Sequence, residues 1–436
     1  MDNRLRVGIA GLGTVGAAAV RILDEKASQL KSQCGRDIAV TGVSARDKQR
    51  DRGVDLSGTK WFDTPQELAA DGDIDVFVEL IGGDEGPARE AVQIALSNGK
   101  HVVTANKALL AKHGVALAKL AEDNGVILNF EAAVAGGIPI IKTMRESLSG
   151  NSVERVYGIM NGTANYILTR MEHDRISFQD CLADAQRLGY AEADPTFDVE
   201  GHDTAHKLAI LTSIAFGTEI AADEIYMEGI ANISLDDIEA AHELGYRIKL
   251  LGVAQKTDTG IEQRVHPTMV PLGSVIAQVE SVTNAVAVDA DVVGSLLMSG
   301  PGAGGNATAS AVIGDIADIA KSKPGHQQAP ALGMPTSQLQ PYTRARMRAH
   351  SGGYFIRMRV HDQPGVFAAI ATRMAENGVS LESIVQRGAN DDNSPKTIIL
   401  ITHKTTESAI REVVRAINSD GHLVSEPQVI RIERAV

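Results

Sequence analysis

The chain has 436 residues, of which 44% are hydrophobic, and its 42 basic and 55 acidic side chains give a net charge of −13. This length predicts two or three domains, and the acidic balance argues against nucleic acid or an anionic membrane as a partner. The sequence contains no apolar run long enough to span a bilayer and begins without a signal-peptide pattern. Its two cysteines lie far apart, so we expect a cytoplasmic protein with reduced thiols.

An apolar stretch at 4–10 predicts a buried parallel strand, and a glycine-rich turn and a helix follow it directly. The turn reads Gly-Leu-Gly-Thr-Val-Gly, the G-x-G-x-x-G pattern in the strand–turn–helix context that dinucleotide binding requires. Its glycines permit a tight turn, close approach of the backbone to a pyrophosphate, and packing of helix on strand. A glycine-rich turn without a ligand is the alternative. The cofactor contacts that we predict here are Gly11, Gly13, Thr14, Val15 and Gly16.

The second strand, at 38–43, is followed by Ser-Ala-Arg, where an NAD-specific site would place an acidic residue. Arg46 stands at this end, and Lys48 and Arg50 follow it. Because a guanidinium binds a 2′-phosphate well, the sequence favours NADP as the cofactor, with NAD as the other possibility. A solvated basic loop is the alternative.

Strands and helices then alternate, and the elements that we expect are 75–81, 87–98, 101–104, 109–123 and 126–131. This alternation predicts an α/β fold with a Rossmann-type, doubly wound parallel sheet, which binds ligands at the carboxyl ends of its strands. Gly82, Thr104 and Lys107 lie at such ends. A lysine at a helix start opposes the helix dipole, so we expect Lys107 to contact a ligand rather than merely to begin the helix.

The middle third predicts an α+β domain, with strands at 153–160, 250–255 and 261–270. Gly136 and Gly137 indicate a tight crossover out of the nucleotide-binding domain.

A second glycine-rich loop, at 299–308, precedes an apolar helix at 309–320. We expect Gly304 of this loop to contact the cofactor, and the segment 305–322 to return to the nucleotide-binding domain. A flexible linker is the alternative.

The stretch 185–207 combines a loop rich in carboxylates with a helix that carries a lysine. Gly189, Pro195 and Gly201 break the first part, which predicts a shaped loop. Asp203 and Lys207 stand four residues apart and therefore share one face of the following helix. Such a site can fix a small polar substrate and supply a proton donor, whereas the alternative is a solvated loop with an ordinary ion pair.

The segment 323–353 is rich in Pro, Gln and Gly and predicts a linker. Beyond it, the patterns predict a small ferredoxin-like βαββαβ module with an Asp362-Gln363-Pro364-Gly365 turn. The boundaries that we predict are 1–133 for the nucleotide-binding domain, 134–304 for the catalytic domain and 354–436 for the terminal module.

The whole chain resembles a homoserine dehydrogenase. The resemblance is carried by the family's spaced signature, which stands here as Ala185, Gly189, Asp194-Pro195, Asp198, Val199, Gly201, Asp203 and Lys207. The terminal module resembles an ACT domain, a type that often binds amino acids. The resemblance implies NAD(P)-dependent interconversion of L-homoserine and L-aspartate 4-semialdehyde, in the biosynthesis of threonine, methionine and isoleucine. It further implies a homodimer or homotetramer with dimerisation through the middle domain, and L-threonine as the effector.

The resemblance also implies roles for individual residues. Lys207 corresponds to the acid/base, and Lys107 to a residue between cofactor and substrate; these two lysines and Asp203 are the residues expected to be catalytic. The residues expected to hold or line the substrate are Gly189, Glu192, Asp198 and Asp203. A structural sodium ion, bound largely through backbone oxygens, would be held by Glu131, Val134, Gly136 and Ile138.

Two alternatives stay open from the residues themselves. An acylating semialdehyde dehydrogenase would need a nucleophilic cysteine, but Cys181 lies in an apolar helical pattern and Cys34 is expected in a loop remote from every motif. An amino-acid sensor without catalysis would keep both folds, although the intact Asp203 and Lys207 argue against it.

Overall fold

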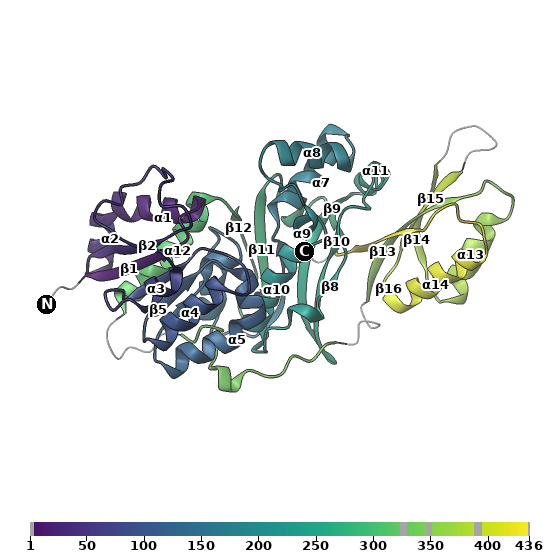
Figure 1. The fold of residues 1–436 in the computed structure, drawn as a ribbon. Helices are drawn as coiled ribbons and strands as arrows, with labels where there is room; N and C mark the ends of the chain where they lie inside the picture. The colour runs from purple at the N-terminus through teal and green to yellow at the C-terminus, as the bar shows by residue number, and fades with distance from the viewer. Residues whose placement is uncertain (1–3, 323–328, 346–350, 388–394, 435–436) are drawn as a thin grey trace.

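The computed structural model describes residues 4–322, 329–345, 351–387 and 395–434. Figure 1 shows an elongated molecule in which the purple and blue N-terminal part, the teal middle part and the yellow C-terminal part follow one another. Within the described ranges, no helix is both long and apolar enough to cross a bilayer.

The N-terminal part is built on a six-stranded parallel sheet in the order β3-β2-β1-β4-β5-β6. Its strands are β1 Leu5–Ala10, β2 Ile38–Ser44, β3 Lys60–Phe62, β4 Val76–Glu79, β5 His101–Thr104 and β6 Leu128–Asn129. This strand order is that of a dinucleotide-binding fold, so the predicted doubly wound sheet is confirmed. The strands β4 and β6 are shorter than the sequence predicted.

Helices cover both faces of this sheet: α1 Thr14–Glu25, α2 Ala27–Cys34, α3 Pro65–Ala70, α4 Pro87–Ser97, α5 Lys107–Asp123 and α12 Gly305–Lys321. On one face, Val7 and Ile9 of β1 share a buried core with Val312 of α12. On the other face, Phe77 of β4 shares a core with residues of α3, α4 and α5. The late helix α12 also packs directly on α1, so residues 305–321 lie against the nucleotide-binding sheet.

The expectation that Cys34 lies in a loop is wrong. Cys34 is the last residue of α2, and its thiol contacts the Ala317 carbonyl of α12. Its half-buried position follows from the return of α12, which is remote in sequence.

The second sheet has eleven strands, and its main order is β12-β11-β7-β9-β10-β17-β13-β15-β14. The strands of the middle part are β7 Val153–Ile159, β8 Tyr226–Met227, β9 Tyr246–Thr257, β10 Gly260–Pro271, β11 Thr283–Ala290 and β12 Gly294–Pro301. Strands β11 and β12 were not predicted, and the loop expected from residue 299 begins only after Pro301. The edge strand β12 is half-exposed and rich in Gly and Ser, so it lacks the periodicity of a buried strand.

Helices of the middle part cover one face of this sheet: α6 Ile140–Lys142, α7 Gly162–Asp174, α8 Phe178–Arg187, α9 Thr196–Val199, α10 His202–Phe216 and α11 Leu235–Glu243. Helix α7 begins at Gly162 because the Asn161 side chain caps it. The opposite face carries a smaller core under the loop that contains Ile276.

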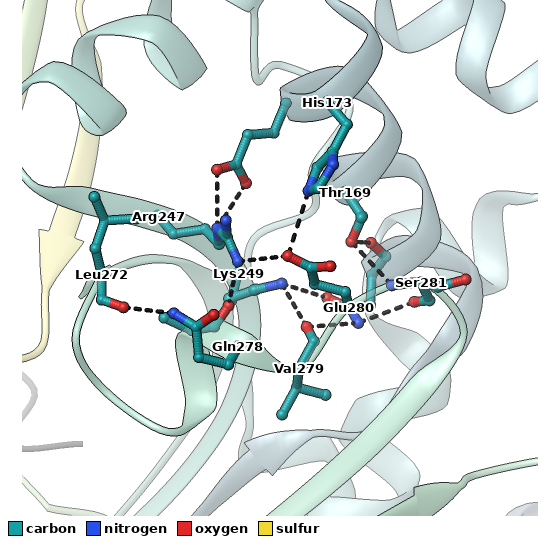
Figure 2. Close-up of polar contacts among 12 residues, drawn as sticks. Thr169, His173, Arg247, Lys249, Leu272, Gln278, Val279, Glu280 and Ser281 are labelled. Atoms are coloured by element: carbon teal, nitrogen blue, oxygen red, sulfur yellow. Dashed lines mark hydrogen bonds and ion pairs between the residues drawn. The ribbon is translucent and has the colours of Figure 1, made fainter.

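That loop is held by a buried polar cluster, shown in Figure 2. Lys249 of β9 is 1% exposed, and its Nζ donates to the Val279 carbonyl at 2.6 Å and to Asn165 Oδ1 at 3.1 Å. Arg247 bridges Glu172 of α7 and Glu280 of the loop, at 2.8 and 2.9 Å. Burial, followed by the charge of Arg247, lowers the pKa of Lys249 to about 8.

The C-terminal elements are β13 Ser351–Val360, α13 Val366–Glu376, β14 Leu381–Arg387, β15 Lys396–Thr402, β16 Thr405–Thr406, α14 Glu407–Ser419 and β17 Gln428–Ile432. They form the predicted ferredoxin-like module. Strand β13 starts inside the segment predicted as a linker. The described part of that segment, 329–345, is not free of the domains: Ile261 N donates to the Thr343 carbonyl at 2.8 Å.

The module is not a separate sheet. Strand β17 pairs in parallel with β10, through Thr268–Arg431 and Met269–Ile432, so the two sheets form one. Buried ion pairs reinforce this joint, including Arg357 Nε to Asp237 Oδ1 at 2.6 Å.

Candidate active site

Helix α10 places the two predicted catalytic side chains in a buried position. Gly201, whose φ is +89°, ends the preceding loop and lets α10 begin at His202. Asp203 and Lys207 are 4% and 7% exposed, and Lys207 Nζ lies 2.7 Å from Asp203 Oδ2. Lys207 Nζ also donates to the Met160 carbonyl at 2.6 Å. The i,i+4 pair is therefore an interior pair and not a solvated one.

A second lysine reaches the same carboxylate from the nucleotide-binding part. Lys107, the first residue of α5, places its Nζ 2.8 Å from Asp203 Oδ1. Helices α5 and α10 pack on one another. The structure thus brings together the three residues predicted as catalytic, at the carboxyl edge of the parallel sheet.

The electrostatics of this cluster favour an acid/base role. Burial alone would raise the pKa of Asp203, but the charges of Lys207 and Lys107 outweigh it and hold that pKa below its usual value. Burial and the neighbouring Lys107 lower the pKa of Lys207, although Asp203 opposes the change. A lysine with a lowered pKa can exchange a proton closer to neutral pH.

Asn161 connects the cluster to the preceding loop. Its Nδ2 donates to Asp198 Oδ1 at 2.7 Å and to Asp203 Oδ2 at 2.9 Å. Its Oδ1 accepts from Ala164 N at 2.8 Å and caps α7. Burial raises the pKa of Asp198, and the charge of Asp203 adds to this rise. Asn161 was not singled out from the sequence, because these contacts form only when the strand end at 159, the loop and α10 come together in the fold.

The loop before α9 is more open. Gly189 has a φ of +78°, and a Cβ placed on it would meet nothing within 4 Å. The Glu192 side chain is exposed, and its backbone carbonyl accepts from Gln186 Nε2 at 3.0 Å. Asp198 therefore lies inside the polar network, whereas Gly189 and Glu192 lie on the exposed loop beside it in sequence.

Aromatic side chains, which the sequence analysis did not single out, lie next to the cluster. Phe197 is 42% exposed, and Lys107 Nζ lies 5.7 Å from the centroid of its ring. His206 meets the same ring edge-on at 5.5 Å. Burial and the charge of Lys107 lower the pKa of His206, which favours its neutral form.

The glycine motif fits a dinucleotide. A Cβ on Gly11 would lie 2.3 Å from the Leu80 carbonyl oxygen, and one on Gly16 would lie 2.0 Å from the Gly11 oxygen. A Cβ on Gly13 would meet nothing within 4 Å, so backbone is open to a ligand there. Thr14 and Val15 begin α1, whose first amides face this opening.

The second glycine loop lies beside the first. Gly304, with a φ of +111°, precedes α12, and a Cβ on Gly305 would lie 2.9 Å from Thr14 Cγ2. Together with Arg52 and Ala307, these residues line a cavity of about 450 Å³. The two helix N-termini therefore share one cavity.

The basic residues beyond β2 occupy different positions. Arg46 is exposed, whereas Arg52 donates from Nε to the Leu12 carbonyl of the glycine motif at 3.1 Å. Lys48 and Arg52 both lie near the Trp61 ring, at 5.7 and 5.6 Å from its centroid. Sequence reasoning missed Arg52, because only folding brings this loop back to the motif.

Gly82 and Thr104 lie at neighbouring strand ends, as predicted. Gly82 N donates to Glu79 Oε1 at 3.0 Å, and the Thr104 hydroxyl donates to Glu79 Oε2 at 2.6 Å. Glu79 was not singled out from the sequence.

The residues expected to hold sodium form one buried turn. Glu131 is 3% exposed, and its carboxylate accepts from Ile141 N at 2.8 Å and Lys142 N at 2.9 Å. Val134 and Ile138 are buried, and Gly136 packs against the backbone of Gly302. Each carboxylate oxygen keeps a further lone pair, and oxygens are the ligands that a hard cation prefers. The described residues hold no cluster of three or more His, Cys, Asp or Glu side chains suited to a metal.

Comparison with known proteins identifies the family. A family model for the "Homoserine dehydrogenase, NAD binding domain" matches residues 11–131, one for "Homoserine dehydrogenase" matches 139–317, and one for the "ACT domain" matches 354–422. A homoserine dehydrogenase from Pseudomonas aeruginosa is 45% identical over 99% of both chains, and one from Neisseria gonorrhoeae is 44% identical over 98% of both. The chain belongs to the homoserine dehydrogenase family.

Solved structures of homoserine dehydrogenases have the same fold as this chain. A homoserine dehydrogenase from Thiobacillus denitrificans superposes with a TM-score of 0.93, at 43% identity, over 99% of this chain and 98% of its own. A hyperthermophilic archaeal homoserine dehydrogenase in complex with NADPH has a TM-score of 0.61 at 29% identity, and covers 72% of this chain but 96% of its own. The chain is therefore an NAD(P)-dependent oxidoreductase with a C-terminal ACT domain.

Membership of the homoserine dehydrogenase family, together with the state of the two cysteines, argues against an acylating dehydrogenase. Cys181 is fully buried in the core, as predicted, and burial raises the pKa of its thiol to about 11. Burial also raises the pKa of Cys34. Neither thiol has the lowered pKa of an activated nucleophile, so an acylating dehydrogenase is not supported.

Proposed function

We propose that the chain catalyses the reversible reduction of L-aspartate 4-semialdehyde to L-homoserine, with NADP as the preferred cofactor and Lys207 as the acid/base. The observation that carries this proposal is the buried Lys207–Asp203–Lys107 cluster at the edge of the nucleotide-binding sheet.

The cluster suits the charge changes of this reaction. When bound, the nicotinamide cofactor supplies the hydride to the aldehyde carbon. Negative charge then builds on the aldehyde oxygen, and the Lys207 ammonium stabilises it and donates a proton to it. In the opposite direction, neutral Lys207 accepts the proton of the homoserine hydroxyl. Asp203 holds both lysines in place, and Lys107 adds a second positive charge between cofactor and substrate.

Carboxylates near the cluster bind the rest of the substrate. The amino group of the substrate is an ammonium at neutral pH, and it needs an acidic partner. Glu192, Asp198 and Asp203 supply carboxylates on the signature segment, with Gly189 lining the same site. Of these, Asp198 is already oriented by Asn161, whereas the exposed Glu192 is free to approach a ligand from solvent.

The basic loop after β2 supports NADP over NAD. Arg46 is exposed at the strand end, and Lys48 and Arg52 lie within the same loop. We assign Arg46 to the 2′-phosphate, and the residues Gly82, Thr104 and Gly304 to the remainder of the cofactor. NAD remains the second cofactor in this proposal.

The finer organisation is also part of the proposal. The nucleotide-binding domain comprises 1–133 with 305–322, and the catalytic domain comprises 134–304. The linker ends before β13, so the ACT domain begins at 351 and not at 354. Glu131 and the backbone oxygens of Val134, Gly136 and Ile138 hold a structural sodium ion. The enzyme works in the cytoplasm as a homodimer or homotetramer, dimerising through the middle domain.

L-Threonine is the proposed effector of the ACT domain. Gly365, with a φ of +95°, ends the Asp-Gln-Pro-Gly turn, and α13 begins at Val366. Free amides at this helix start can meet the carboxylate of an amino acid. Inhibition would then act through a shift between two states of the joined sheet.

An NADPH-oxidation assay with L-aspartate 4-semialdehyde tests the function directly. We expect turnover that depends on both substrates and, in reverse, reduction of NADP by L-homoserine. Turnover with other small aldehydes but not with this one would contradict the assignment of substrate.

A further inference from the structure

Glu79, the last residue of β4, is fully buried beneath the turn that contains Gly82. Its Oε1 accepts from the backbone amides of Ile81, at 2.7 Å, and Gly82, at 3.0 Å, and its Oε2 accepts from the Thr104 hydroxyl at 2.6 Å. Among the residues that the structure describes, no lysine or arginine forms an ion pair with it. A buried carboxylate is costly unless donors compensate it, so Glu79 depends on the two strand ends that it connects.

The connection continues to the start of α5. Thr104 Oγ1 accepts from Asn106 N at 3.0 Å, and Asn106 Nδ2 donates to the Gly83 carbonyl at 2.7 Å. Asn106 Oδ1 accepts from Leu109 N at 3.1 Å and caps α5. The ends of β4 and β5 are thereby tied into one polar unit on which α5 begins.

Lys107 is the first residue of α5 and reaches Asp203 from there. A displacement of this helix start moves the lysine relative to the carboxylate, and small misplacements of such groups lower rates strongly.

We propose that Glu79 is a positioning residue. It shapes the Gly82–Gly83 turn that faces the cofactor and, through Thr104 and Asn106, fixes the place of Lys107. The proposal rests on the function proposed above for Lys107. One buried carboxylate thereby positions both the turn at the cofactor and the second lysine of the site.

The test uses the full-length enzyme and separates the two contacts of the Glu79 carboxylate. The turn arm is the contact of Oε1 with the amides of Ile81 and Gly82, and the Thr104 arm is the contact of Oε2 with the Thr104 hydroxyl. Glu79→Gln keeps an oxygen for the turn amides but replaces the charged acceptor of the Thr104 hydroxyl by an amide donor, so it reverses and weakens only the contact with Thr104. Thr104→Val breaks the same arm from the other side, and Thr104→Ser keeps the hydroxyl. Glu79→Ala breaks both arms. Glu67→Gln, on an exposed helix cap remote from the site, is the control.

We expect Glu79→Gln and Thr104→Val each to lower kcat about tenfold or more. Because Thr104 is itself assigned to the cofactor, little change in NADPH affinity, measured by fluorescence titration, is expected only for Glu79→Gln. Thr104→Ser recovers most of the loss. The double variant is no worse than the poorer single variant, because both changes break one route. Glu79→Ala additionally weakens NADPH binding, and Glu67→Gln behaves as the wild type.

Full activity of Glu79→Gln and Thr104→Val overturns the proposal, and so does an additive loss in the double variant. If Glu79→Gln does not fold, the Thr104→Val and Thr104→Ser pair carries the test. A wild type without turnover contradicts the proposed function instead. In that case, unchanged NADPH affinity of folded Glu79→Ala still contradicts the role of Glu79.

Discussion

Asp203 dominates the electrostatics of the site because each of its two oxygens meets a different lysine. The carboxylate is interior, so its charge acts on Lys207 and Lys107 with little screening by water. It raises the pKa of Lys207 against the effects of burial and of Lys107, which lower it. The proton affinity of Lys207 therefore depends on this one charge.

We predict that Asp203→Asn shifts the pH dependence of the enzyme. Reduction of the semialdehyde needs protonated Lys207, so its rate falls as pH rises through the pKa of that lysine. Loss of the Asp203 charge lowers this pKa further, and the alkaline limb of kcat/KM moves to lower pH. A profile measured in the reduction direction checks this, and a limb that stays in place or moves to higher pH would show that Asp203 does not set the pKa.

Arg46 and Arg52 are predicted to act differently on the cofactor. Arg46→Ala weakens NADPH more than NADH, because it removes a partner of the 2′-phosphate only. Arg52→Ala weakens both cofactors, because Arg52 supports the Leu12 carbonyl of the glycine motif. Dissociation constants for both cofactors, measured for both variants, test the difference. Equal weakening of the two cofactors by Arg46→Ala would remove its assignment.

The site residues that could be predicted from the sequence are those that belong to one spaced motif. Asp198, Asp203 and Lys207 converge because the motif fixes one loop and one helix. Asn161 and Glu79 were missed because their contacts depend on strand ends and helix starts that only the folded chain brings together.

Among the elements, strands and helices of the nucleotide-binding part were predictable because buried parallel strands are continuous apolar runs bounded by glycines. Strands β11 and β12 form an edge hairpin, and β12 is half-exposed with Gly and Ser in its sequence. Edge strands of this kind lack the apolar run that identifies a strand.

The loop over β9 provides a stability prediction. Lys249 pins this loop through the Val279 carbonyl (Figure 2), and its pKa falls from 10.5 to about 8 in the folded state. Between these two values the unfolded chain binds more protons, so the free energy of unfolding rises with pH in this window. Lys249→Met lacks that rise.

Urea unfolding at pH 8 and pH 10, compared between the wild type and Lys249→Met, isolates this contribution from other titrating groups. We expect the wild type to gain stability relative to the variant at the higher pH. An equal pH dependence of the two proteins would show that Lys249 keeps its ordinary pKa.

At the scale of the whole molecule, the ACT domain is joined to the catalytic sheet. The sequence predicted a module behind a linker and did not reveal this joint. The pairing of β10 with β17 connects segments that are remote in sequence, so it leaves no local pattern. Arg357 and Asp237 form a pair across this joint, and Asp237 is fully buried. Removal of the module takes away this ion pair and the pairing of β17 with β10, so the catalytic part loses stability.

We therefore predict that a chain ending near residue 345 keeps dehydrogenase activity but unfolds at lower urea concentration, and that it loses inhibition by threonine. Kinetics with and without threonine check the regulatory half. Persistent inhibition of the truncated enzyme would place threonine in the substrate site, and a full-length enzyme insensitive to threonine would make the module an assembly device.

The central claim is that Lys207 exchanges the proton of the reaction. Its most direct test is the turnover of Lys207→Met with saturating NADPH and L-aspartate 4-semialdehyde, with NADPH affinity measured on the same preparation. We expect a fall in kcat of about a thousandfold, in the range of general acid catalysis, with NADPH affinity unchanged. A loss of less than about tenfold, roughly 1.4 kcal/mol of barrier, in a folded variant that binds NADPH normally would contradict it.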